Sequence, residues 1–64
     1  MAILIKIIDT GTDYSICLFQ SEKTLMYVVT THDNVFRKHF DHWYYSNREL
    51  AEKEVKQRVS EYKI

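Results

Sequence analysis

Three short runs rich in β-branched, aliphatic and aromatic residues follow one another at residues 2–9, 14–20 and 25–31. The first connection contains Gly11, the only glycine of the chain, among residues that favour turns, and the second is the polar stretch SEKT. Such runs are typical of β-strands. Connections this short join antiparallel neighbours, because parallel strands need a crossover of a dozen or more residues. The sequence therefore predicts an antiparallel β-meander.

The second run alternates in side-chain character. Tyr14, Ile16 and Leu18 lie on one face of a strand, and Cys17 and Phe19 point to the other. A free cysteine in the middle of an apolar strand is usually a small buried hydrophobe. We therefore expect Cys17 to pack and not to act as a nucleophile.

A helix is predicted over residues 47–62. Ser46 and Glu49 have the capping-box spacing, in which each side chain bonds the other's backbone amide. The predicted apolar stripe consists of Ala51, Val55, Val59 and Tyr62, with Leu50 beside it. The acidic and basic pairs expected on the exposed helix surface are Glu49–Lys53, Glu52–Lys56 and Glu54–Arg58.

The segment 35–45 fits two templates. As a helix, it places Phe36, Phe40, Trp43 and Tyr44 on one face. As a strand, it places Phe36, Phe40 and Tyr44 on one side and Trp43 and Tyr45 on the other. We favour a fourth strand, because it is rich in β-formers and reaches the capped helix without a linker. The alternative is a three-stranded sheet followed by two helices.

The chain of 64 residues is expected to form one domain, 1–64. Its predicted class is α+β: a small antiparallel β-meander of three to four strands packed by one C-terminal helix. A single cysteine leaves no internal disulfide, which indicates a reducing compartment. No secretory signal is recognisable, and no apolar run approaches the roughly 20 residues of a membrane span. We therefore expect a cytoplasmic protein that makes no membrane contact.

No residue set with a catalytic pattern is evident. A nucleophile needs an adjacent base, and one glycine is too few for a phosphate-binding loop. His39 and His42 would share one face of a helix but would point to opposite sides of a strand. A structural zinc ion also needs more ligands than this pair. We expect no catalytic residues, no metal site, no cofactor and no enzymatic activity.

The aromatic stretch is also the only locally basic part of the chain. Residues 35–48 hold three basic side chains and one acidic one, although the whole chain has a formal net charge of zero. On the strand interpretation, Phe36, Phe40 and Tyr44 lie under the helix and the opposite face is free for recognition. The candidate partner-binding residues are Arg37, His39, Asp41, Trp43, Tyr45 and Arg48. On the helix interpretation, Arg37, Lys38, Asp41 and Tyr45 point outward instead.

Tyr, Trp and Arg are the residue types that dominate protein interfaces. The sequence therefore favours a small non-enzymatic module that binds another protein. In size and composition it is similar to compact phage or mobile-element proteins that inhibit a host enzyme, and to small antitoxins, an analogy that no motif supports. A single-stranded RNA or DNA binder using residues 36–48 is the second hypothesis, since stacking rings and basic side chains suit such a ligand. A structural homodimer is the third.

Overall fold

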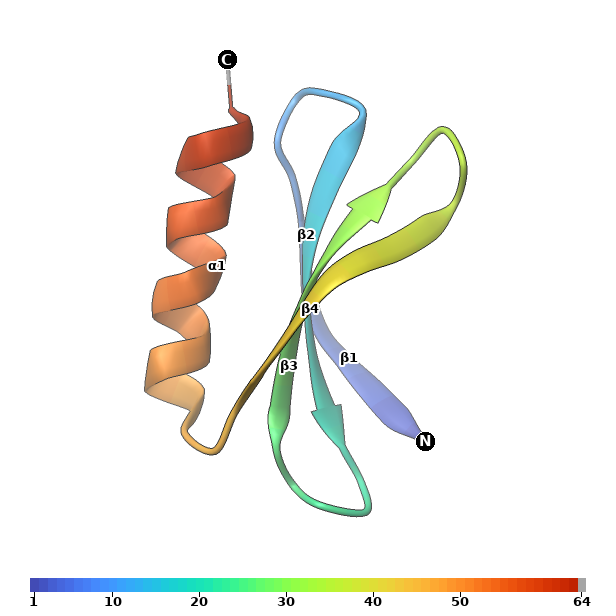
Figure 1. The fold of residues 1–64 in the computed structure, drawn as a ribbon. Helices are drawn as coiled ribbons and strands as arrows, with labels where there is room; N and C mark the ends of the chain where they lie inside the picture. Colours follow the sequence, from blue (N-terminus) through green and yellow to red (C-terminus); the bar gives the residue numbers. More distant parts are fainter. Residues whose placement is uncertain (64) are drawn as a thin grey trace.

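Four antiparallel strands and one helix make up the fold of the computed structural model, which describes residues 1–63. The sheet has the order β1-β2-β3-β4, and every neighbouring pair is antiparallel (Figure 1). This arrangement confirms the predicted α+β meander, with the fourth strand in place of a second helix. The elements are β1 (Ala2–Asp9), β2 (Tyr14–Ser21), β3 (Tyr27–Asp33), β4 (Lys38–Tyr45) and α1 (Arg48–Tyr62).

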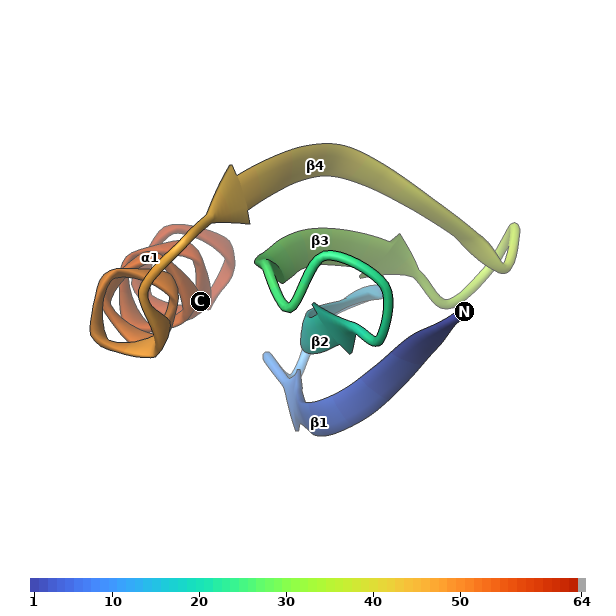
Figure 2. The same ribbon diagram turned by 90° about the horizontal axis from the view of Figure 1, so that it is seen from below.

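The helix covers one face of the twisted sheet and packs mainly on its two central strands (Figure 2). The core between them consists of Ile16, Leu18, Val29, Ala51 and Val55, each no more than 1% exposed. Val59 and Tyr62 pack against this cluster, so the predicted helix stripe is confirmed. Burying one such aliphatic side chain contributes roughly 1.5–3 kcal/mol.

The opposite side of the sheet, which we call the open face, has no helix over it. The registers place Leu4 and Ile7 of β1 on this face beside Phe19 and Cys17 of β2. Cys17 is buried there, as predicted for a packing cysteine, and burial raises the pKa of its thiol. Leu4 and Ile7 are about half exposed. The fold therefore leaves part of its apolar surface in contact with solvent.

The helix begins one residue later than the capping-box pattern indicated. Asn47, not Ser46, is the N-cap, and its side-chain oxygen accepts a hydrogen bond of 2.7 Å from the amide of Glu49. Asn is as good an N-cap as Ser, and its side-chain oxygen reaches the second amide of the helix. The start of the helix at Arg48 is therefore fixed by the residue next to the predicted cap.

The turn before β4 is longer than predicted, because residues 35–37 belong to it and not to the strand. The carboxylate of Asp33 accepts from the amides of Val35 and Phe36, and its carbonyl accepts from Arg37. Arg37 closes the turn in the left-handed region, with φ 58°. The side chain of Asp33 thus competes successfully with strand pairing. Phe36, predicted to lie under the helix, is 73% exposed in this turn.

Both edge strands carry an irregularity. The β1–β2 register shifts between Leu4 and Lys6, and the β3–β4 register shifts opposite the stretch between Val29 and Thr31. In β4 the extra residues include Asp41, whose φ of 56° is left-handed. A bulge of this kind inserts a residue, so the alternation of side chains between the two faces is inverted beyond it.

The charged side chains of the helix pair differently from the expected pattern. Glu54–Arg58 forms as predicted, with 2.6 Å between Oε2 and Nε. Glu52 instead contacts Lys6 of β1 at 2.7 Å and Arg48 at 3.3 Å, so it ties the helix to the far edge strand. Within residues 1–63, the predicted pairs Glu49–Lys53 and Glu52–Lys56 are not among the ion pairs. In the part of the chain that the structure describes, no helix has the length and apolar character needed to cross a bilayer.

Candidate functional site

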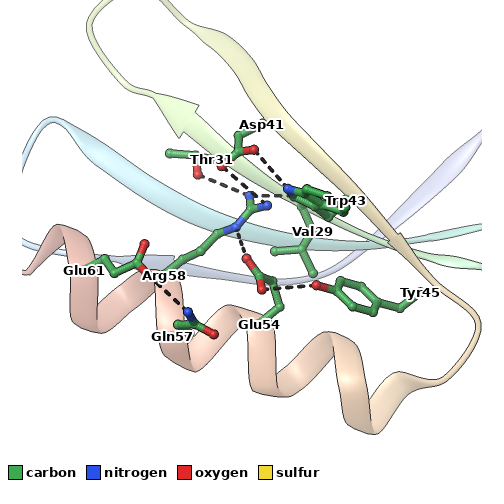
Figure 3. A network of polar contacts seen from close by, with 9 residues as sticks. All are labelled: Val29, Thr31, Asp41, Trp43, Tyr45, Glu54, Gln57, Arg58 and Glu61. Carbon is green, nitrogen blue, oxygen red and sulfur yellow. Dashed lines mark hydrogen bonds and ion pairs between the residues drawn. The ribbon is translucent and has the colours of Figure 1, made fainter.

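A buried arginine joins the helix to the edge strand β4. Arg58 is 2% exposed, and its Nε lies 2.6 Å from Glu54 one turn earlier in the helix (Figure 3). Its Nη1 donates to the carbonyl of Val29 and to the hydroxyl of Thr31, both on β3, in long bonds of 3.4 and 3.3 Å. The guanidinium therefore extends from the helix to the sheet, and its Nε and Nη1 have partners on both elements.

The same guanidinium also contacts the bulge of β4. Nη2 of Arg58 lies 3.7 Å from the carboxylate of Asp41 and makes no hydrogen bond within residues 1–63. Asp41 in turn accepts a 3.2 Å hydrogen bond from the indole nitrogen of Trp43. Figure 3 shows the chain of contacts from the helix through Asp41 to the indole. The helix thereby orients a side chain that is itself 57% exposed.

Tyr45 lies where the end of β4 packs against the helix. It packs against the core cluster, and its hydroxyl donates a 3.1 Å hydrogen bond to Glu54 (Figure 3). Burial and this bond raise the pKa of the Tyr45 hydroxyl. The prediction that it lies on the face away from the helix was wrong, because the bulge at Asp41 inverts the end of the strand.

The inversion also moves the other rings of β4. Trp43 pairs in register with Val29, so it belongs to the helix side of the sheet and not to the opposite side as predicted. Tyr44 pairs with Val28 and is 61% exposed on the open face, contrary to the prediction. Phe40 is on the helix side as predicted, edge-on to Tyr14 at 5.9 Å between ring centroids.

The remaining candidate residues are dispersed. His39 pairs with His32 on the open face, where the prediction placed it. Arg37 lies in the turn before β4, and Arg48 begins the helix and pairs with Glu52. Of the six candidates, the structure thus brings only Asp41, Trp43 and Tyr45 into one connected set, through Glu54 and Arg58.

Sequence reasoning missed the buried role of Arg58, which it treated as an exposed partner of Glu54. A signal was available in the helix stripe. The buried positions Ala51, Val55 and Arg58 are spaced four and three residues apart, the spacing of a face directed at the core. An arginine at such a position either lies buried with partners or extends along the apolar surface to water.

His39 and His42 lie on the same face of β4, which a regular strand does not allow. His39 and His42 both line a hollow on the open face, because the bulge between them inserts a residue. The expectation that they point to opposite sides of a strand was therefore wrong. Among residues 1–63, no group of three or more His, Cys, Asp or Glu side chains is placed to hold a metal ion.

Comparisons of the chain with models of protein families, with curated proteins and with solved structures each found no match. The geometry of the described residues is therefore the basis for assigning a function. The feature with the clearest geometry is the outer part of β4, which we call the β4 rim and define as Phe40, Asp41, Trp43 and Tyr44.

Proposed function

We propose that this chain is a small non-enzymatic protein-binding module whose partner docks on the β4 rim. It would act by occupying a surface of that partner, in the manner of a phage or mobile-element inhibitor or an antitoxin. The observation that carries the proposal is the indole of Trp43, which is 57% exposed and yet held in place by Asp41. An exposed ring with a fixed orientation is unusual unless something uses it.

The hydrogen bond from Trp43 to Asp41 reduces the conformational entropy that is lost when a partner binds. An interface side chain that is free in the unbound protein loses about 0.5–1.5 kcal/mol of rotamer entropy when it docks. Trp43 is already restrained through Asp41, which faces the buried Arg58. A partner that covers the indole therefore gains its apolar burial with less ordering. Trp is also among the residues enriched at the energetic centres of interfaces.

The composition of the β4 rim fits the same use. Phe40 and Trp43 lie on the helix side of β4, and Tyr44 lies on the open face. Aromatic rings are therefore present on both faces of this edge strand. Their exposed fractions are 38%, 57% and 61%. Asp41, half exposed beside the indole, adds a polar group that a partner can recognise. Large rings with a few polar groups are the usual content of an interface.

The basic residues are arranged less favourably for nucleic acid. Arg37 and Lys38 lie at the start of β4, and Arg48 lies beyond its other end. At about 3.3 Å per residue, the backbone of the eight-residue strand places these residues roughly 20 Å apart. Single strands are bound by a continuous positively charged groove with aromatic rings along it. The geometry thus favours a protein partner over the second hypothesis.

The test is capture of a partner by the wild-type chain and by Trp43→Ala. Each tagged protein is immobilised and exposed to an extract of the cells that carry the gene, with and without nuclease. We expect one protein to be retained in stoichiometric amount by the wild type after nuclease. Retention by Trp43→Ala should fall at least tenfold, because the ring that fills the partner's pocket is gone.

Phe36→Ala is the matched control, since Phe36 is an even more exposed ring in the turn before the strand. It should retain the partner as the wild type does, and both variants should unfold at the wild-type urea concentration. Equal retention by Trp43→Ala would contradict the β4 rim as the site. Loss of the bound material with nuclease would favour the nucleic-acid hypothesis, and recovery of the chain itself would favour the homodimer.

A further inference from the structure

A hollow of about 240 Å³ opens on the face of the sheet that the helix does not cover. With about 30 Å³ per water in the liquid, this volume corresponds to roughly eight waters, which suits a compact molecule of about ten non-hydrogen atoms. All four strands contribute to its wall. The lining residues are Ala2, Phe19, Val28, Thr30, His39 and His42.

The polar part of the wall is made of imidazoles. His39 is edge-on to the ring of Phe19, at 5.5 Å between centroids. Its Nδ1 lies 2.9 Å from the hydroxyl oxygen of Thr30, so in the protonated ring Nε2 is the nitrogen left to donate to a ligand. The ring of His32 lies 4.5 Å from that of His39 on the same face. His42 lines the hollow beside them.

The groups around His39 are cationic or neutral. His32 on β3 and His42 on its own strand oppose its protonation, and β2 adds Cys17, which bonds to Thr30. The nearest carboxylate along β4, Asp41, faces Arg58 on the helix side. Burial, followed by the two histidines, lowers the pKa of His39. A negative charge placed in the hollow would be the first counter-ion that these imidazoles meet.

We propose that the hollow binds small apolar carboxylates, with the ring or chain of the ligand against Phe19 and Val28 and the carboxylate at His39 and His42. Apolar walls with a small number of directed polar groups are the usual construction of a ligand site. The wall contains no lysine or arginine, which disfavours a strongly hydrated phosphate. This site is separate from the β4 rim and does not depend on the proposed protein partner.

The test uses three probes of one shape and different charge: phenylacetate, the neutral phenylacetamide and the cationic phenethylamine. Amide chemical shifts of the isotope-labelled protein are followed at about pH 6.5, the ordinary pKa of histidine, and at about pH 7.5. We expect phenylacetate to shift the lining residues with millimolar affinity, as befits so small a ligand. Its affinity should rise about tenfold at the lower pH, because binding takes up one proton. Phenylacetamide should bind more weakly at both pH values, and phenethylamine more weakly still.

Two variants assign the charge recognition to the imidazoles. His39→Gln and His42→Gln should each remove the pH dependence of phenylacetate binding, whereas Ile7→Ala, on the same face outside the lining, should keep it. If His39→Gln fails to fold, the comparison of the three probes on the wild type still decides the matter. Equal affinities for the three probes, affinity independent of pH, or shifts that avoid the lining residues would overturn the proposal.

Discussion

At the scale of single residues, Arg58 links three elements of the molecule, the helix, β3 and β4. It joins the helix to β3 through Val29 and Thr31, and to the bulge of β4 through Asp41. Its closest partner, Glu54, also accepts from Tyr45. A buried cation is tolerated only when such partners offset its desolvation. The orientation of Asp41 and Trp43 in the β4 rim is therefore linked to one interior charge.

Arg58→Ala should lower the free energy of unfolding by about 2–4 kcal/mol, since it removes a buried partner from two carboxylates that remain partly exposed. Urea unfolding followed by far-UV circular dichroism measures this loss, and the near-UV signal of Trp43 should weaken in the folded baseline. The matched control is Arg48→Ala, which breaks an exposed pair of the same spacing with Glu52 and should cost less than about 1 kcal/mol. Equal losses in the two variants would contradict the role given to burial.

His39 makes the stability depend on pH. Its pKa in the folded chain lies below the ordinary value of 6.5, so the unfolded chain binds the proton more readily. The contribution of neutral His39 is therefore present above about pH 6.5 and is lost as the pH falls below that value. The urea midpoint of the wild type should decrease between about pH 7.5 and pH 5.5, and His39→Gln should flatten this decrease.

A second titrating group provides the control for this pH profile. The hydrogen bond from Lys6 is the main cause that lowers the pKa of Glu52 below 4.5. The stability that Glu52 contributes is consequently lost only as the pH falls below about 4.5. Glu52→Gln should leave the profile between about pH 7.5 and pH 5.5 unchanged. A profile flattened by Glu52→Gln and not by His39→Gln would be evidence against the histidine.

At the scale of elements, β4 differs from a regular strand in three ways. It is an edge strand, it begins only after the Asp33 turn, and its alternation inverts at Asp41. A bulge at an edge also interrupts the row of backbone groups with which another chain could pair. The other edge strand, β1, has its own irregularity. Both edges are thus poorly suited to edge-to-edge association, which leaves side chains as the means of recognition.

The helix start offers a test at this scale. Asn47→Ala should lower the free energy of unfolding by about 1 kcal/mol, because the amide of Glu49 loses its side-chain acceptor. Ser46→Ala should change it by less than about 0.3 kcal/mol, as expected for a surface substitution that removes no cap. Urea midpoints of the two variants give the comparison directly. A larger loss in Ser46→Ala would place the cap at Ser46, where the capping-box pattern predicted it.

At the scale of the whole molecule, a chain of 64 residues has one small core and little reserve. A domain of this size rarely gains more than about 3–5 kcal/mol from its core alone. Cys17 is the single cysteine of the chain and lies buried as a free thiol. The burial of Ile16, Leu18 and Val29 under the helix must then supply most of the folding free energy.

Leu18→Ala should therefore leave the protein largely unfolded at 25 °C, since truncating a fully buried leucine costs about 2–5 kcal/mol. Far-UV circular dichroism and urea unfolding would show the loss. Ile7→Ala, on the open face and 55% exposed, is the control and should cost less than about 1 kcal/mol. A Leu18→Ala variant that unfolds cooperatively near the wild-type midpoint would contradict a single helix-covered core.

Side-chain period and connection length, which are local properties, were enough to predict the first three strands, their antiparallel order and the buried stripe of the helix. They left residues 35–45 open between a strand and a helix. Ile16 and Leu18 were assigned to one face correctly for that reason. Some local details were still misplaced by a few residues, since Asp33 and Asn47 compete with neighbours of similar propensity.

The side chains of β4 that face the helix could not be predicted from local patterns. The backbone at Asp41 is left-handed, a conformation that aspartate adopts only occasionally, so the local sequence does not place a bulge there. At the bulge, the carboxylate of Asp41 faces the guanidinium of Arg58, which extends from the helix to the sheet. That long-range contact coincides with the inversion that brings Tyr45 into the core and Tyr44 to the open face. The period of the side chains reflects only neighbouring residues, so it cannot predict an ion pair between residues so far apart in the chain.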